Sequence, residues 1–189
     1  ELTAACVALA GMIGINSLAC APILVGGTEG QKQRFLTPLN EAGKTAAFCL
    51  TEKDAGSDAG SLTTRAERLG DEYVLNGKKR FITNASHADL YTVFATVDPA
   101  KRVAGITGFI VPRATAGLSI GKVEDKMGQR ALDVAEVILE DVRVPVENRL
   151  GEEGDGFKIA MKSLDEGRVN IAACAVGVAR AACEAALAY

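Results

Sequence analysis

The stretch Glu72-Tyr73-Val74-Leu75-Asn76-Gly77-Lys78-Lys79-Arg80-Phe81-Ile82-Thr83 decides the fold class of this chain. Both halves contain the β-branched and aromatic residues that favour strands. Between them stands Asn76-Gly77, the dipeptide preferred in two-residue hairpin turns. The stretch therefore predicts a β-hairpin that turns at Asn76-Gly77, with Phe81 and Thr83 on one face of its second strand.

Similar runs of Val, Ile, Thr, Phe and Tyr extend on both sides of this stretch, from residue 45 to about residue 144. Turn signals separate the runs, at Leu69-Gly70-Asp71, Asp98-Pro99, Pro112, Gly117 and Gly121. Roughly eight short strands of this kind are typical of an all-β barrel or sandwich.

Helical patterns flank the strands. The chain to about Leu39 is predicted to be helical, with an interruption at Pro22, and Thr28-Glu29-Gly30-Gln31 matches a capping box that begins a second helix. From about residue 154 to residue 189, apolar residues recur at helical spacing. We therefore predict an α+β multidomain chain. It consists of a helical N-terminal piece (residues 1–44), a central antiparallel β-barrel or sandwich (45–150) and the first helix of a C-terminal helical bundle (151–189).

The composition excludes several classes of protein. The 189 residues are 48% hydrophobic and carry a net charge of −3, which suits a globular core and not a disordered chain. No basic run is longer than Lys78-Lys79-Arg80, so nucleic acid is not an expected partner. Residues 2–28 carry no charge and could span a bilayer by length. However, Asn16, Pro22 and the lack of a basic flank favour a buried helix, and no membrane contact is expected.

The five cysteines stand at positions 6, 20, 49, 174 and 183 and form no C-x-x-C pair. An odd number in apolar or helical stretches predicts reduced, small core residues in a reducing compartment, not a secreted disulfide framework. His87 is the only histidine, so we expect no metal site.

Three segments carry groups suited to ligand binding. Residues 48–58 form a strand that breaks into a loop of small residues, whose main-chain N–H groups suit a pyrophosphate or a polar ring edge. Phe81 could cover a flat ring while Thr83 donates a hydrogen bond to its edge. Asp165 and Arg168 lie three residues apart on one side of the last helix. A plainer interpretation of each stays open: a strand-exit turn, a half-buried strand end and an intrahelical ion pair.

The last helix is unusually apolar. Between residues 169 and 189 only Arg180 and Glu184 are charged, so we expect the helix to be buried on most faces. This favours an excised middle of a longer helix–β–helix protein, in which further segments or other subunits cover the helix.

Taken together, in this order and at these separations, the segments resemble the acyl-CoA dehydrogenase family of flavoproteins over essentially the whole chain. The resemblance rests on Gly30-Gln31-Lys32-Gln33-Arg34-Phe35-Leu36, Leu50-Thr51-Glu52, Ala55-Gly56-Ser57-Asp58, residues 76–84, Gly108-Phe109-Ile110-Val111, Glu124-Asp125-Lys126-Met127-Gly128, residues 140–145, residues 156–161 and Leu164-Asp165 with Arg168. Asn16-Ser17-Leu18 and Glu124-Asp125-Lys126 look most like the short-chain members.

The resemblance implies an FAD-dependent enzyme that converts a short-chain acyl-CoA thioester to 2-enoyl-CoA. It also implies an electron-transferring flavoprotein as acceptor, a homo-oligomer (dimer or tetramer), and a location in the bacterial cytoplasm or the mitochondrial matrix. The alternatives are an acyl-CoA oxidase, a nitroalkane-oxidase-like flavoenzyme, and a β-domain binding module without catalysis.

By the same resemblance, the residues that bind FAD are Phe48, Leu50, Thr51, Gly56, Ser57, Phe81, Ile82 and Thr83. Thr51 is expected to hydrogen-bond the polar edge of the flavin ring, Phe81 to pack on the ring and Thr83 to donate toward its N5 atom. Ser57, Asp165 and Arg168 are the expected contacts of acyl-CoA.

The sequence departs from the family pattern at two places. Lys53-Asp54 stands where many relatives have Pro-Gly, so a different bend is expected after Thr51. Gly167 stands where one subgroup carries the glutamate that removes the α proton, and the commoner position of that glutamate is expected beyond Tyr189. No catalytic residue is therefore assigned, and the 189 residues alone are expected to show no dehydrogenase turnover and to bind FAD weakly or not at all.

Overall fold

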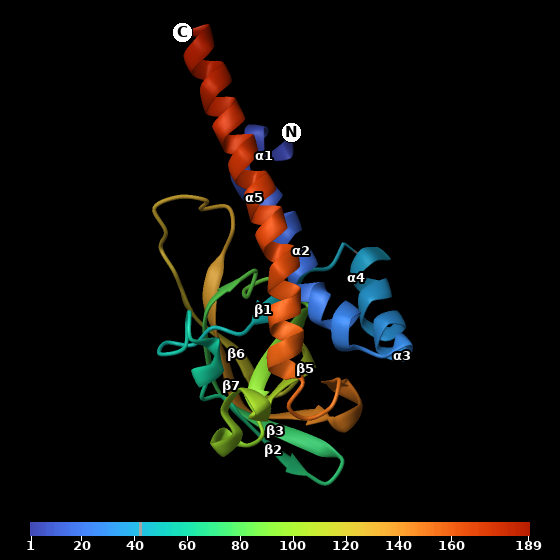
Figure 1. Ribbon diagram of the computed structural model, residues 1–189. Helices are drawn as coiled ribbons and strands as arrows, with labels where there is room; N and C mark the ends of the chain where they lie inside the picture. The colour runs from blue at the N-terminus through green and yellow to red at the C-terminus, as the bar shows by residue number, and fades with distance from the viewer. Residues whose placement is uncertain (42) are drawn as a thin grey trace.

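An eight-stranded sheet lies at the centre of the structure, a computed structural model that describes residues 1–41 and 43–189 (Figure 1). The strands are β1 (Ala46–Cys49), β2 (Arg65–Leu69), β3 (Glu72–Thr83), β4 (Leu90–Thr96), β5 (Ile106–Pro112), β6 (Leu118–Val123), β7 (Val134–Pro145) and β8 (Arg149–Leu150). Their order is β6-β7-β3-β2-β4-β5-β8, with β1 also paired to β4. This bears out the predicted α+β class with a central β region.

The sheet is mixed, which corrects the prediction of an antiparallel one. β1 runs parallel to β4 and pairs with residues 90–93, and β2 meets the same strand in parallel at Thr96. The two strands therefore lie end to end along one edge of β4. The chain between them, residues 50–64, leaves the sheet and forms a loop. A sequence pattern of alternating residues marks strands but not the direction in which they pair.

The predicted hairpin turn at Asn76-Gly77 is wrong. β3 continues through this dipeptide, and the turn lies at Gly70-Asp71, where Leu69 pairs with Glu72. At Asn76 the register against β7 shifts in a β-bulge. There Asn76 exchanges two hydrogen bonds with Asp141, one from the main-chain amide of Asp141 (2.8 Å) and one to its carboxylate (3.0 Å). A type I′ turn needs positive φ at both central residues, and here only Gly77 has it, at 154°.

A second bulge changes the end of β3. The register against β7 shifts again between Lys79 and Ile82, and Phe81 adopts a φ of 57°, which is rare for an aromatic residue. The strict alternation that placed Phe81 and Thr83 on one face therefore does not hold. Bulges redirect side chains, so this one determines the directions in which the side chains of Phe81, Ile82 and Thr83 point.

The helices are α1 (Leu2–Ala5), α2 (Val7–Gly26), α3 (Glu29–Gln31), the π-helix η1 (Lys32–Leu36), α4 (Thr37–Glu41) and α5 (Gly156–Ala188). Three short 3₁₀ segments, η2 (Ala59–Ser61), η3 (Pro99–Gly105) and η4 (Val146–Asn148), lie in the loops. Pro22 does not interrupt α2, contrary to prediction; the chain breaks instead at Cys6 and Gly27, which are extended. The capping box is confirmed, with Thr28 and Gln31 bonded to each other's main-chain amides.

Two hydrophobic clusters hold the fold together. One lies within the β region and includes Tyr73, Val93 and Phe109. The other joins the sheet to the helices and includes Ile23, Phe94 and Ile159. The second cluster fixes α2 and the start of α5 across β4 and β5, the side of the sheet where the candidate site lies.

The residues of this chain cover only the start of α5, and the burial of its other faces was expected from further segments or other subunits. Its buried residues are Gly156, Ile159, Ala160 and Ser163, all near its start. Beyond them it extends away from the sheet beside α2 and α1 (Figure 1), and apolar side chains such as Ile171 and Val176 are exposed. By length and composition alone α2 and α5 could each cross a bilayer, a criterion that core helices also meet; here they pack against each other, and α2 also packs on β1.

The cysteines correct a further prediction. All five are free thiols, but Cys6 and Cys183 are exposed, and only Cys49 is fully buried. Burial raises the pKa of the Cys49 thiol to about 12, so this residue is an inert core group.

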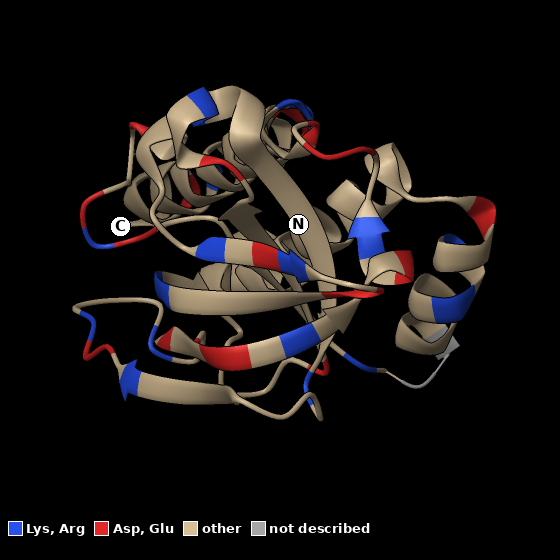
Figure 2. Cartoon of the chain, turned by 90° about the horizontal axis from the view of Figure 1, so that it is seen from below, with Lys and Arg blue, Asp and Glu red and all other residues tan. Residues whose placement is uncertain are grey.

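Charged residues of both signs are interspersed on the strands seen from below in Figure 2. Several form ion pairs across neighbouring strands, such as Lys78 with Glu136 (3.0 Å) and Arg143 with Glu72 (3.2 Å). Ion pairs that reach solvent contribute at most about 1 kcal/mol each, so the hydrophobic clusters, not these pairs, hold the sheet in place.

Candidate functional site

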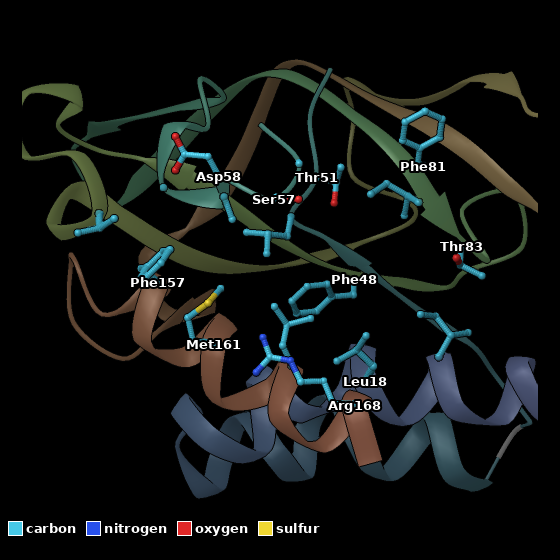
Figure 3. A pocket seen from close by; sticks show the side chains of 18 residues that line it. Leu18, Phe48, Thr51, Ser57, Asp58, Phe81, Thr83, Phe157, Met161 and Arg168 are labelled. Atoms are coloured by element: carbon cyan, nitrogen blue, oxygen red, sulfur yellow. The ribbon is translucent and has the colours of Figure 1, made fainter. Parts of the chain in front are cut away.

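A cavity of about 570 Å³ lies between the loop that follows β1, the end of β3 and the helices α2 and α5 (Figure 3). Its lining residues are Ile15, Leu18, Phe48, Leu50, Thr51, Gly56, Ser57, Asp58, Ala59, Gly60, Phe81, Ile82, Thr83, Val103, Phe157, Met161, Leu164 and Arg168. All eight residues predicted from the resemblance to hold a cofactor are among them. The structure thus brings together residues that are more than thirty positions apart in the sequence.

Thr51 and Thr83 are the polar groups that define the rim. Thr51 lies two residues after the end of β1, and Thr83 is the last residue of β3. Figure 3 shows their hydroxyl groups bordering the same hollow, with Phe48 below them. Two hydroxyls and an apolar floor suit a flat ring that has a polar edge.

The segment from Phe48 to Gly60 supplies much of the remaining lining. The Phe48 ring packs on Phe94 at 5.2 Å between centroids, which fixes the floor of the cavity. After Glu52 the chain turns back on itself, with the Glu52 amide bonded to the Ala55 carbonyl oxygen at 3.0 Å. This turn places Gly56 and Ser57, both exposed, at the mouth.

Phe81 borders the cavity differently from its neighbours. Its side chain is 54% exposed, and Figure 3 shows the ring pointing away from Phe48 and Arg168. The guanidinium of Arg80 lies 4.8 Å from the centre of this ring. The bulge at Phe81 explains this direction, and the expected packing of Phe81 on a flavin stays a prediction.

Of the two predicted contacts on α5, Arg168 lies at the cavity and Asp165 does not. Arg168 lines the cavity and rises toward it from α5 (Figure 3), whereas Asp165 is not among the lining residues. The two side chains form an exposed ion pair of 2.5 Å, so the plainer interpretation of an intrahelical pair is realised. Arg168 remains available to a ligand because its side chain is 71% exposed.

A buried ion pair supports the rim, and sequence reasoning did not single it out. Lys79 is completely buried, and its Nζ lies 2.7 Å from Oε1 of Glu52, which is itself 5% exposed. Burial by itself raises the pKa of the Glu52 carboxyl. The charge of Lys79 and the hydrogen bonds from Lys79, Thr64 and Thr63 outweigh this effect and lower the pKa to about 2. Glu52 is therefore ionised in the folded protein.

The apolar wall was also missed. Ile15 and Leu18 on α2, together with Phe157, Met161 and Leu164 on α5, close the cavity opposite the strands. Their helical spacing was visible in the sequence, but the same spacing serves any core helix. Which helix faces the site depends on the packing of α2 on α5.

Comparison with known proteins identifies the family. Residues 1–42, 47–142 and 154–189 match the N-terminal, middle and C-terminal domains of acyl-CoA dehydrogenases, respectively. The chain is 46% identical to the mitochondrial short-chain specific acyl-CoA dehydrogenase of Mus musculus, over all of this chain and 46% of the relative. It is 47% identical to the caffeyl-CoA reductase-Etf complex subunit CarC of Acetobacterium woodii, over 92% of this chain and 46% of the relative.

A solved structure agrees with this. Butyryl-CoA dehydrogenase from Megasphaera elsdenii superimposes with a TM-score of 0.97 at 48% identity, covering all of this chain and 50% of that one. The chain spans about half the length of the curated relatives it matches. With three family domains matched in order and the fold reproduced throughout, the chain belongs to the acyl-CoA dehydrogenase family.

Proposed function

We propose that this chain forms the flavin-facing part of an FAD-dependent acyl-CoA dehydrogenase that oxidises a short-chain acyl-CoA thioester to 2-enoyl-CoA. The observation that carries the proposal is the cavity shared by Thr51, from the loop after β1, and Thr83, from the end of β3, opposite an apolar wall of helix residues. The short-chain specificity named for the relative from Mus musculus supports the substrate class.

The cavity fits the flavin. Its volume of about 570 Å³ falls within the range of roughly 300–1,000 Å³ found for cofactor and ligand sites. Thr51 and Thr83 supply hydrogen-bond donors for a polar ring edge, and Phe48 and Leu18 supply apolar surface. The loop of small residues 56–60 at the mouth suits a pyrophosphate, because small residues let main-chain amides approach it.

Several of the lining residues then have a role in the reaction. When bound, FAD supplies the acceptor for the hydride that leaves the β carbon. The hydroxyls of Thr51 and Thr83 act as fixed donors to the charge that develops, without reorganising water. Met161 and Phe48 exclude water from the reacting atoms. Ser57 and Arg168 hold the polar part of acyl-CoA, with Asp165 orienting the Arg168 guanidinium.

The residues that line the cavity include no base that we assign to the removal of the α proton. Among the described residues that line the cavity, Asp58 is the only carboxylate, and it accepts a hydrogen bond from the Ser61 hydroxyl. Gly167, at the position where one subgroup carries the catalytic glutamate, has no side chain that could act as a base. We therefore propose that the base belongs to a residue beyond Tyr189.

We also propose the wider setting expected from the resemblance. An electron-transferring flavoprotein is the acceptor, which the Etf complex named for the Acetobacterium woodii relative supports. The protein works as a dimer or tetramer in the bacterial cytoplasm or the mitochondrial matrix. Residues 1–44, 45–150 and 151–189 form its helical, β and second helical parts.

The test uses the full gene product that contains this chain, loaded with FAD and kept free of oxygen. Butyryl-CoA should bleach the oxidised flavin band at about 450 nm. Thr51→Val and Thr83→Val should each slow the bleaching at least tenfold, because each removes a fixed donor worth about 2 kcal/mol or more. A protein that binds no FAD, or that keeps its flavin oxidised with every acyl-CoA, overturns the proposal.

Two further measurements separate the alternatives. Rapid peroxide formation in air marks an acyl-CoA oxidase, and bleaching by nitroethane but not by butyryl-CoA marks a nitroalkane oxidase. The 189-residue chain alone serves as a second control. Formation of 2-enoyl-CoA by this chain would contradict the placement of the base.

A further inference from the structure

Lys79 holds both neighbours of Thr51. Its Nζ donates one hydrogen bond to Oε1 of Glu52 (2.7 Å) and another to the main-chain carbonyl oxygen of Leu50 (3.2 Å). The next amide along the strand, that of Arg80, donates to the carbonyl oxygen of Thr51 at 2.8 Å. Residues 50, 51 and 52 are thus each fixed to the same short piece of β3.

Glu52 closes the other end of the loop. Its Oε2 accepts hydrogen bonds from the amide and the hydroxyl of Thr63, both at 2.7 Å. Its Oε1 accepts from the amide (3.0 Å) and the hydroxyl (2.5 Å) of Thr64, in addition to Lys79. One carboxylate therefore ties the start of the loop of residues 50–64 to its end.

Stability alone is a weak reason for such a pair. Two buried charges lose much of their attraction to the cost of leaving water, and apolar side chains of similar volume often fill the same space at no loss. A buried charged pair whose acceptors all receive hydrogen bonds does fix the positions of the residues bonded to it, because charged hydrogen bonds are short and weaken steeply when their geometry changes. Neither Glu52 nor Lys79 lines the cavity, so an effect of the pair on a ligand must pass through Thr51, which stands between the two residues that Lys79 holds.

We propose that Glu52 and Lys79 are positioning residues that hold the hydroxyl of Thr51 against the polar edge of the flavin. This inference rests on the proposed function, because Thr51 is placed there by it. The alternative is that the pair only stabilises the fold.

A double-mutant cycle on the FAD-loaded full gene product distinguishes the two. The variants are Thr51→Val, the neutral pair Glu52→Gln with Lys79→Met, and all three substitutions together. The readouts are the flavin dissociation constant, the visible absorption envelope of the bound flavin and its midpoint potential. The matched control is Lys78→Met with Glu136→Gln, which removes a partly exposed ion pair one residue along the same strand.

If the pair positions Thr51, the neutral pair and Thr51→Val should each raise the flavin dissociation constant by about five- to tenfold, the effect of losing one good hydrogen bond. Both should shift the absorption envelope in the same direction, and the triple variant should show no larger effect than Thr51→Val. The control should match the wild type. A neutral-pair variant that has wild-type affinity, spectrum and potential and is only less stable to heat overturns the inference.

A conservative variant covers the case in which the neutral pair does not fold. Glu52→Asp keeps the charge and withdraws the carboxylate by one methylene. It should change the flavin dissociation constant and absorption envelope in the same direction as the neutral pair, but by less. In the flavin-free protein, hydrogen exchange at the Arg80 amide should be at least tenfold faster in this variant, while the amides of the paired residues Tyr73 and Val144 keep their protection. Unchanged exchange at Arg80 overturns the inference. A wild-type protein that binds no flavin would instead contradict the proposed function, so the two failures can be told apart.

Discussion

The side-chain amide of Gln31 donates a hydrogen bond to the main-chain carbonyl oxygen of Arg149 at 2.8 Å and so joins the N-terminal helices to β8. The same nitrogen also donates to the carbonyl oxygen of Glu147 at 2.7 Å. The side-chain oxygen of Gln31, Oε1, accepts a hydrogen bond from the main-chain amide of Thr28. Gln31 is 8% exposed, so all these bonds form away from bulk water. One residue therefore serves as both a helix cap and a link to the sheet.

Replacing Gln31 should cost more than replacing its capping partner. Gln31→Met removes three hydrogen bonds and leaves two carbonyl groups without this donor, so we expect a loss of about 2–3 kcal/mol in the free energy of unfolding. Thr28→Ala removes only the cap, at about 1 kcal/mol. Urea denaturation measures both, and equal losses in the two variants would contradict the linking role.

The Glu52–Lys79 pair should respond very differently to single and double substitution. Lys79→Met leaves an uncompensated charge on buried Glu52, and we expect a loss of about 3–5 kcal/mol. Adding Glu52→Gln should recover part of that loss, because no charge then remains buried, while the glutamine NH2 group cannot accept the second of the two main-chain hydrogen bonds that Glu52 takes from Thr63 and Thr64. Lys78→Met, at the neighbouring pair in which the lysine is exposed, should cost less than about 1 kcal/mol. A double variant as unstable as Lys79→Met would count against this account.

The depressed pKa of Glu52 makes stability depend on pH in acid. Its pKa is about 2 in the folded protein against 4.5 for the unperturbed group, so the unfolded chain takes up the proton first. The contribution of Glu52 is fully present above about pH 4.5 and is lost as the pH falls toward 2. Thermal unfolding between pH 5 and 2 should therefore show a steeper loss in the wild type than in the variant that combines Glu52→Gln with Lys79→Met.

Gly77 should tolerate no side chain. Its φ is 154°, and a Cβ at this position would lie 2.6 Å from the Thr64 hydroxyl and 2.8 Å from Thr64 Cα. We expect Gly77→Ala to cost more than about 2 kcal/mol. Gly70→Ala is the matched control, since Gly70 also has positive φ (64°) but no atom within 4 Å of an added Cβ. Its expected cost is about 1 kcal/mol, and chemical denaturation compares the two.

Arg168 should matter for ligand binding more than for stability. Its ion pair with Asp165 is exposed, so Arg168→Met should change the free energy of unfolding by less than about 0.5 kcal/mol. Loss of a charged hydrogen-bond donor in the cavity should weaken acyl-CoA binding about tenfold in the full gene product. Calorimetric titration with butyryl-CoA measures this, and unchanged affinity would remove Arg168 from the substrate site.

The sequence predicted the elements of the fold better than their pairing. Alternating and helical patterns marked the β region and the long last helix, because those patterns follow from which side chains face a core. Asn76-Gly77 misled because its turn preference is local, whereas the bulge it forms depends on Asp141, far along the chain. The parallel pairing of β1 with β4 was not predicted for the same reason, since nothing near Ala46 in the sequence specifies Leu90 as its partner.

The candidate site shows a similar division. Thr51 and Thr83 could be selected from the resemblance and were found on one cavity. Lys79 could not, because a lysine in a strand is usually solvated, and its complete burial depends on an acceptor that the loop after β1 provides. The direction of Phe81 was also hidden, since a single bulge reverses the alternation on which the prediction rested.

The parallel pairing of β1 with β4 bears on the order in which the protein folds. Residues 46–49 can pair with residues 90–93 only when the chain between them closes into a loop, which is slower than pairing of neighbouring segments. Thr51 lies two residues after β1, so this part of the rim becomes ordered only once β1 has paired with β4. A chain shortened before residue 90 would therefore present no ordered Thr51 to a ligand.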